Sequence, residues 1–91
     1  MRDYEAIFVF RPEDELYNKG KELIKQELEN ASATIVKEED MGARDLAYAV
    51  KKETRGHYHF YEAQIEPQKL ESITSSIKLM DSVLKYLFVR K

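Results

Sequence analysis

Two histidines, His57 and His59, are the residues whose type and spacing come nearest to a metal site. On an extended strand, side chains two positions apart point the same way, with their backbones about 6.5–7 Å apart. Imidazoles placed like this can share a metal ion, but the sequence offers no third ligand within reach. Two histidines on one strand more often serve packing or stacking, so we predict no metal and no cofactor.

Other kinds of reactive chemistry find no support in the residue types. The chain has no cysteine, which excludes disulfides, thiolate catalysis and cysteine-based metal sites. It shows no serine–histidine–aspartate spacing of the usual kinds, no glycine-rich phosphate loop and no acid pair beside a predicted pocket. We therefore expect a binding or structural protein and not an enzyme.

Composition and charge narrow the class of protein further. The length suits one domain, residues 1–91, and 43% hydrophobic with 35% charged residues is ordinary for a folded chain. The net charge of −2 argues against binding nucleic acid through bulk charge, although 15 lysines and arginines allow local basic patches. No apolar stretch approaches the roughly 20 residues of a membrane helix, and the start has no signal-peptide pattern. We expect a cytoplasmic protein.

Periodicity predicts a strand and then a helix in the first third of the chain. Residues 2–10 alternate as a strand, and Pro12 followed by three acids signals the start of a helix. Apolar residues recur at helical spacing from Leu16, and we expect this helix to end near Asn30. Gly20 lies on the apolar stripe, where it would allow a close approach to the sheet.

The middle of the chain predicts two strands joined as a hairpin. The first begins near residue 33, is bent or bulged near Gly42 and continues into the hairpin. The polar connector 52–56, which ends in Gly56, is typical of a short hairpin loop. The return strand is predicted from about His57 to Ile65.

A second helix and a last strand complete the chain. Pro67 opens the helix, and its buried face is expected to carry Leu70, Ile73 and Ile77. Residues 83–89 form the strand. The order strand, helix, strand, strand, helix, strand predicts an α+β, ferredoxin-like split βαβ sandwich, with a four-stranded antiparallel sheet and both helices on one face.

The face of the sheet away from the helices would be left open, and its residues are unusually apolar. The first, third and fourth strands carry apolar or aromatic groups on both parities, so the outward set is too apolar for a face that meets only water. A small sheet can tolerate a few exposed rings or self-associate; otherwise a protein or an RNA covers this face. Ile7 and Val9 oppose Phe8 and Phe10 on the first strand, and Tyr58 and Phe60 oppose Tyr61 and Ile65 on the third, so alternation alone leaves open which set faces outward. The candidate RNA contacts, cations near strand ends and the hairpin tip, are Arg2, Arg44, Arg55, Arg90 and Lys91.

One alternative is a stand-alone binder of single-stranded RNA that resembles the RNA-recognition motif. Residues 55–60 partly resemble the third-strand box of that motif, and residues 7–9 partly resemble its first-strand box. The aromatic positions of the third-strand box fall on His57 and His59, and Tyr58 occupies a position where the box has a small residue. A small-molecule or regulatory module that dimerises across the sheet stays open as a third hypothesis.

Residues 42–51, Gly-Ala-Arg-Asp-Leu-Ala-Tyr-Ala-Val-Lys, carry a stronger resemblance. They are similar to the signature of the S-six family of bacterial small-subunit ribosomal proteins. That signature has a glycine, a basic residue two positions on, a polar or charged residue, leucine, serine or alanine, tyrosine, any residue, isoleucine and often a basic residue. Val50 replaces the isoleucine at nearly the same volume. The resemblance covers the whole chain, from Met-Arg-Asp-Tyr-Glu at the start through Pro12, Gly56 and Pro67 to the hydrophobic and then basic last strand.

The resemblance implies the fold expected above and a non-catalytic, structural role in the small ribosomal subunit. It implies binding to the central region of the small-subunit ribosomal RNA together with a small basic ribosomal protein of the family called S-eighteen. Such a partner would bring much of the positive charge that this acidic chain lacks, and the pair would present one RNA-binding surface.

The resemblance also implies a register and some contacts. Tyr58 and Phe60 would lie on the open face, with the even-numbered apolar residues of the first strand beneath the helices. In this register the candidate contacts with a protein partner are Ile7, Val9, Tyr58 and Phe60. Arg2 and Arg44 are carried over as RNA contacts, whereas the other three cations are inferred from position alone. Within the signature, Leu46 and Tyr48 are expected to pack.

Overall fold

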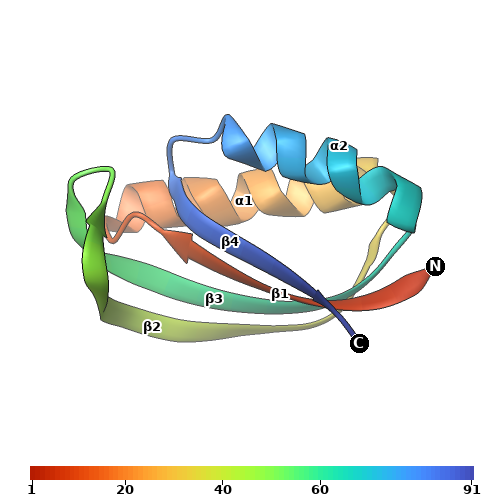
Figure 1. Ribbon diagram of the computed structural model, residues 1–91, viewed down its shortest axis with the longest axis horizontal. Helices are drawn as coiled ribbons and strands as arrows, with labels where there is room; N and C mark the ends of the chain where they lie inside the picture. The colour runs from red at the N-terminus through yellow and green to blue at the C-terminus, as the bar shows by residue number, and fades with distance from the viewer.

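The computed structural model describes all 91 residues, which form six elements in the predicted order. They are β1 (Arg2–Phe10), α1 (Asp14–Asn30), β2 (Thr34–Val50), β3 (Glu53–Ile65), α2 (Pro67–Lys78) and β4 (Val83–Arg90). The strands form one antiparallel sheet in the order β2-β3-β1-β4. Both helices lie along one face of this sheet, and the other face is uncovered (Figure 1). The predicted ferredoxin-like split βαβ sandwich is confirmed.

The two helices start and pack as their sequences predict. Asp14 and Glu15 occupy the first turn of α1, where carboxylates suit the positive end of the helix dipole. Pro67 is the first residue of α2, where its missing N–H leaves no hydrogen bond unmade. Gly20 faces the sheet so closely that an added Cβ would lie 2.5 Å from Cδ1 of Phe10, and the predicted close approach is confirmed.

The core lies between the helices and the inward face of the sheet. Alternate residues of β1 point toward the helices, and Phe8 and Phe10 are 0% exposed. Ile24 and Leu28 of α1 and Ile73 of α2 close over them. The predicted register of β1 is therefore confirmed.

The hairpin between β2 and β3 differs from its prediction. The turn consists of Lys51 and Lys52, whose φ angles of +49° and +67° are those of a two-residue type I′ turn, and β3 begins at Glu53. Gly56, expected in the loop, lies within β3. A glycine is needed there because a Cβ at this position would collide with Cγ1 of Val9 on the neighbouring strand. Lysine pairs are not typical of type I′ turns, whereas glycine is a common turn residue. The loop was therefore predicted at Gly56 and not at the two lysines.

The predicted bend in β2 is confirmed at Gly42. The pairing of β2 with β3 shifts register between Asp40 and Gly42, and Gly42 has a φ of +83°, as in a β-bulge. Beyond the bulge the hairpin rises to the level of the helices (Figure 1). Two interactions hold its tip against the rest of the fold. Nζ of Lys51 donates a hydrogen bond to the carbonyl of Val83, and Arg11 forms an ion pair with Glu53.

Candidate functional site

The open face of the sheet carries an apolar patch that no element covers. Ile7 sits at its centre, paired with Phe60 of β3 on one side and Leu87 of β4 on the other. Leu87 is 57% exposed and Val89 is 48% exposed, while the rings of β3 on this face are half-buried. We define the apolar patch as Ile7, Tyr58, Phe60, Leu87 and Val89. Three predicted partner contacts thus lie together on one surface.

Val9, the fourth predicted partner contact, differs from the prediction in exposure. It lies on the open side of β1, opposite Tyr58, but only 5% of it is exposed. Its side chain packs into the space over Gly56, beside which Leu46 of the hairpin also lies. Val9 therefore supports the patch from within the fold and offers little surface to a partner.

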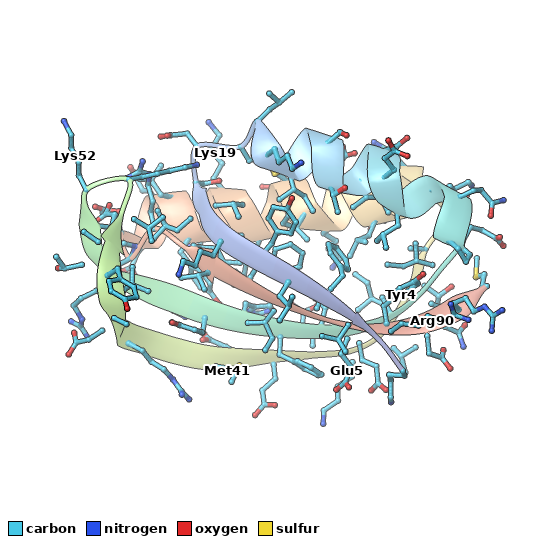
Figure 2. All side chains as sticks on the ribbon, viewed as in Figure 1. Tyr4, Glu5, Lys19, Met41, Lys52 and Arg90 are labelled. Atoms are coloured by element: carbon cyan, nitrogen blue, oxygen red, sulfur yellow. The ribbon has the colours of Figure 1, made fainter.

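The five predicted cations fall into two groups at opposite ends of the sheet. Arg2, Arg90 and Lys91 lie at the end where both termini meet, and Figure 2 shows Arg90 there beside Tyr4. Arg44 and Arg55 lie near the hairpin end of the sheet, whose turn residue Lys52 is labelled in the same view. A nine-residue strand such as β1 spans about 30 Å, and the molecule is 35 Å long, so an RNA that contacts both groups has to span most of the length of the protein.

The cations also differ in whether an acid neutralises them. Arg55 forms an ion pair with Asp45 at 3.2 Å, and Lys91 forms one with Glu62. The other three cations make no ion pair; they are Arg2, Arg44 and Arg90. These three guanidinium groups are exposed and available to phosphates.

Arg44 and Tyr48, two signature residues, both end in solvent. The guanidinium of Arg44 lies 5.8 Å from the centroid of the Tyr58 ring, within reach of a cation–π contact on the open face. Tyr48 is 78% exposed, so the expectation that it packs is wrong; it lies on the edge strand β2, where the pairing with β3 is irregular between Asp45 and Val50. Leu46 is half-buried, as expected of a packing residue.

The two histidines point away from the open face, into a polar network beneath α1. The ring of His57 stacks on Tyr17 with centroids 3.5 Å apart, and Oδ1 of Asp40 accepts a hydrogen bond from its Nε2. His59 is 2% exposed, and its two ring nitrogens form hydrogen bonds with the hydroxyl of Tyr17 and the carboxylate of Glu38. No group of three histidine, cysteine or acidic residues is arranged to hold a metal ion.

This arrangement weakens the stand-alone single-strand hypothesis. The motif that it invokes stacks bases on sheet aromatics of the exposed face. The corresponding box positions, His57 and His59, are turned toward α1 and engaged by its residues. Bases on the open face would meet Tyr58 and Phe60 instead.

Tyr17, Glu38 and Asp40 were missed by the sequence reasoning. Tyr17 had a detectable signal, because it stands at helical spacing with the buried residues Gly20 and Ile24, whereas Leu16 is only half-buried. The two acids had none, because a charged stretch of an edge strand gives no hint that one side faces a helix.

Comparison with known proteins decides the family. The family model described as ribosomal protein S6 matches residues 3–90. The chain belongs to the ribosomal protein S6 family. A small ribosomal subunit protein bS6 of Treponema denticola is 39% identical over 90 residues, which cover 99% of this chain and 97% of the relative. The bS6 protein of Borreliella afzelii is 35% identical across 100% of this chain and 66% of the relative.

A solved structure of the family has the same fold. The crystal structure of 30S ribosomal protein S6 from Thermotoga maritima superposes with a TM-score of 0.89 at 26% identity, covering 99% of this chain and 87% of that one. Family membership makes the chain a structural, non-enzymatic component of the small subunit of the bacterial cytoplasmic ribosome, associated with ribosomal RNA and proteins. None of its helices is long and apolar enough to span a membrane.

Proposed function

We propose that the chain binds the central region of the small-subunit ribosomal RNA jointly with a small basic ribosomal protein of the S-eighteen family. The proposal extends the family assignment to specific partners. The observation that carries it is the apolar patch, which lies on the open face between two groups of cations.

A protein is the partner that suits the apolar patch. The side chains of Leu87 and Val89 are aliphatic, so they have no charge and no hydrogen-bond donor for a phosphate. Contact with an apolar protein surface would remove them from water, which is favourable. Beside the patch, Glu5 and Glu62 face each other across β1 and β3, and Lys91 pairs with one of them. Adjacent carboxylates repel RNA and attract a basic protein.

Ribosomal RNA is the partner that suits the two ends of the sheet. Arg2 and Arg90 at one end and Arg44 at the other are exposed and form no ion pair. Because guanidinium groups bind phosphates in bidentate fashion, they can hold RNA segments that pass on either side of a protein seated on the patch. A net charge of −2 makes this chain dependent on its basic partner for the rest of the attraction.

Two leucine variants test the role of the patch. Leu87→Ala removes an apolar contact at the patch, and Leu79→Ala removes a similar side chain, 87% exposed, at the end of α2. Calorimetric titration with the S-eighteen family protein should show binding weakened about fivefold or more for Leu87→Ala, as expected for about 1 kcal/mol of lost apolar contact. Leu79→Ala should bind as the wild type does. Equal affinities for both variants would place the partner elsewhere and refute the proposal.

A further inference from the structure

A single carboxylate oxygen holds the bulge of β2. Oδ1 of Asp40 accepts one hydrogen bond from the backbone N–H of Gly42 at 2.9 Å and another from Nε2 of His57 at 2.5 Å. The register shift lies between Asp40 and Gly42, so Met41 is the extra residue of the bulge. The hydrogen bond with His57 makes the pKa of Asp40 lower than its usual value, so this carboxyl remains an ionised acceptor near neutral pH.

The histidine that bonds Asp40 is itself anchored to α1. Its ring is nearly parallel to the ring of Tyr17, with an angle of 10° between the planes and 3.5 Å between the centroids. Tyr17 is 5% exposed and packs edge-on against Phe10, so its position is fixed by the core. A chain of contacts thus runs from the helix to the bulge. We call Tyr17, His57 and Asp40 the bulge clip.

The bulge decides the face on which the following residues emerge. Side chains alternate along a strand, so a shift of one residue exchanges the two faces. With Met41 as the extra residue, Arg44 lies opposite Gly56, on the open face beside Tyr58. Without the bulge, Arg44 would lie opposite Arg55 and emerge on the side of the helices.

We infer that Asp40 and His57 are positioning residues, which hold the bulge and so direct Arg44 and the hairpin toward the bound ribosomal RNA. The geometric part stands on the contacts of the bulge clip. The part that concerns RNA rests on the proposed function.

Variants of Asp40 test the geometric part in the free protein. Asp40→Ala removes both hydrogen bonds, whereas Asp40→Asn keeps an amide oxygen that can accept both. Glu39→Ala is the matched control, because Glu39 is the neighbouring acid, lies opposite Phe60 on the other face and makes no ion pair. Nuclear Overhauser effects across the strands, from Gly42 to Tyr58 and from Arg44 to Gly56, report the register.

We expect Asp40→Ala to lose these cross-strand effects, while Asp40→Asn and Glu39→Ala keep them. Their survival in Asp40→Ala would overturn the inference. If Asp40→Ala fails to fold, His57→Phe gives the same test, because a phenyl ring can keep the stack on Tyr17 without the bond to Asp40. That variant should also lose the cross-strand effects, and retention would count against the clip.

Salt dependence of RNA binding tests the second part. In the complex with RNA and the partner protein, Asp40→Ala should lower the slope of log affinity against log salt by about 0.7–0.9, the amount for one lost phosphate contact. Asp40→Asn should restore the slope. If Asp40→Ala loses the cross-strand effects but the wild type does not bind the RNA, the proposed function is refuted and the geometric inference stands. If Asp40→Ala keeps the cross-strand effects and the wild type binds the RNA, the geometric inference is refuted and the proposed function stands.

Discussion

The hydroxyl of Tyr17 donates a hydrogen bond to Nδ1 of His59 across 3.0 Å. The direction follows from the other ring nitrogen, because Nε2 of His59 lies 3.1 Å from Oε1 of Glu38, which only accepts as a carboxylate. In the neutral ring, Nε2 therefore carries the proton and Nδ1 is the acceptor. A second proton on the ring would face the Tyr17 hydroxyl and force it to turn away.

The buried position of His59 makes the stability of the fold dependent on pH. Burial lowers the pKa of His59 below its ordinary value. Below about pH 6.5 the unfolded chain takes up a proton that the folded chain resists, so the free energy of unfolding falls as pH drops through that value. The groups that act on His59 are Tyr17 and Lys21 of α1, Glu38 and Asp40 of β2, and Tyr61 of β3.

Urea unfolding at several pH values between about 5 and 7.5 measures this dependence. The wild type should lose stability toward acid by at most about 1.4 kcal/mol per pH unit from this residue. His59→Gln, which keeps hydrogen-bonding groups but does not titrate, should lose that component of the slope. Identical slopes for the two proteins would show that His59 does not control the pH response.

Tyr17→Phe should destabilise the fold although the aromatic ring is kept. The stack on His57 and the contact of Lys21 with the ring survive, but Nδ1 of the buried His59 loses its donor. An unpaired buried polar atom costs about 1–3 kcal/mol. Tyr48→Phe is the control, because its hydroxyl is on a side chain 78% exposed. Equal unfolding free energies for both variants, measured in urea, would contradict the buried network.

Gly42→Ala should destabilise the protein through backbone conformation alone. No atom lies within 4 Å of the position that a Cβ would take, so there is space for the methyl group, but the φ of +83° disfavours it. The expected loss is about 1–2 kcal/mol. Gly42→Asn should lose less, because asparagine tolerates positive φ better than alanine does. An alanine variant as stable as the wild type would mean that the bulge relaxes at no cost.

Sequence periodicity predicted the elements because each one buries a regular stripe or alternates across a sheet. Even the bend at Gly42 carried a signal, since an isolated glycine within a strand marks a bulge. The turn at Lys51 and Lys52 carried none, because it is held by contacts from distant segments, among them the carbonyl of Val83. Its residue types oppose the conformation, and tertiary contacts override them.

The candidate site was predictable in part, for a related physical reason. Alternation placed Tyr58 and Phe60 on one face of β3, the family resemblance indicated that this is the open face, and their partners across β1 confirm it. Alternation could not foresee that Val9 would be covered or that Arg55 would be paired with Asp45, because both depend on how the hairpin twists. Nor could spacing join Tyr17 to His59, which are 42 residues apart.

Arg44 and Arg55 should contribute unequally to RNA binding. Arg44 makes no ion pair, whereas Arg55 is already 3.2 Å from Asp45. Arg44→Ala should therefore weaken assembly with RNA and lower its salt slope by about one phosphate contact, with little change in unfolding free energy. Arg55→Ala should change the slope less. A loss of stability without a change in slope would make Arg44 structural.

The most direct test of the proposed function is binding to central-domain ribosomal RNA, measured with and without the S-eighteen family protein. We expect weak binding by the chain alone and much tighter, cooperative binding with the partner. The chain is acidic, and its three predicted RNA contacts without an ion pair, Arg2, Arg44 and Arg90, are divided between two distant ends of the sheet. Tight binding of short single strands by the chain alone, with no gain from the partner, would contradict the account and favour the stand-alone RNA binder.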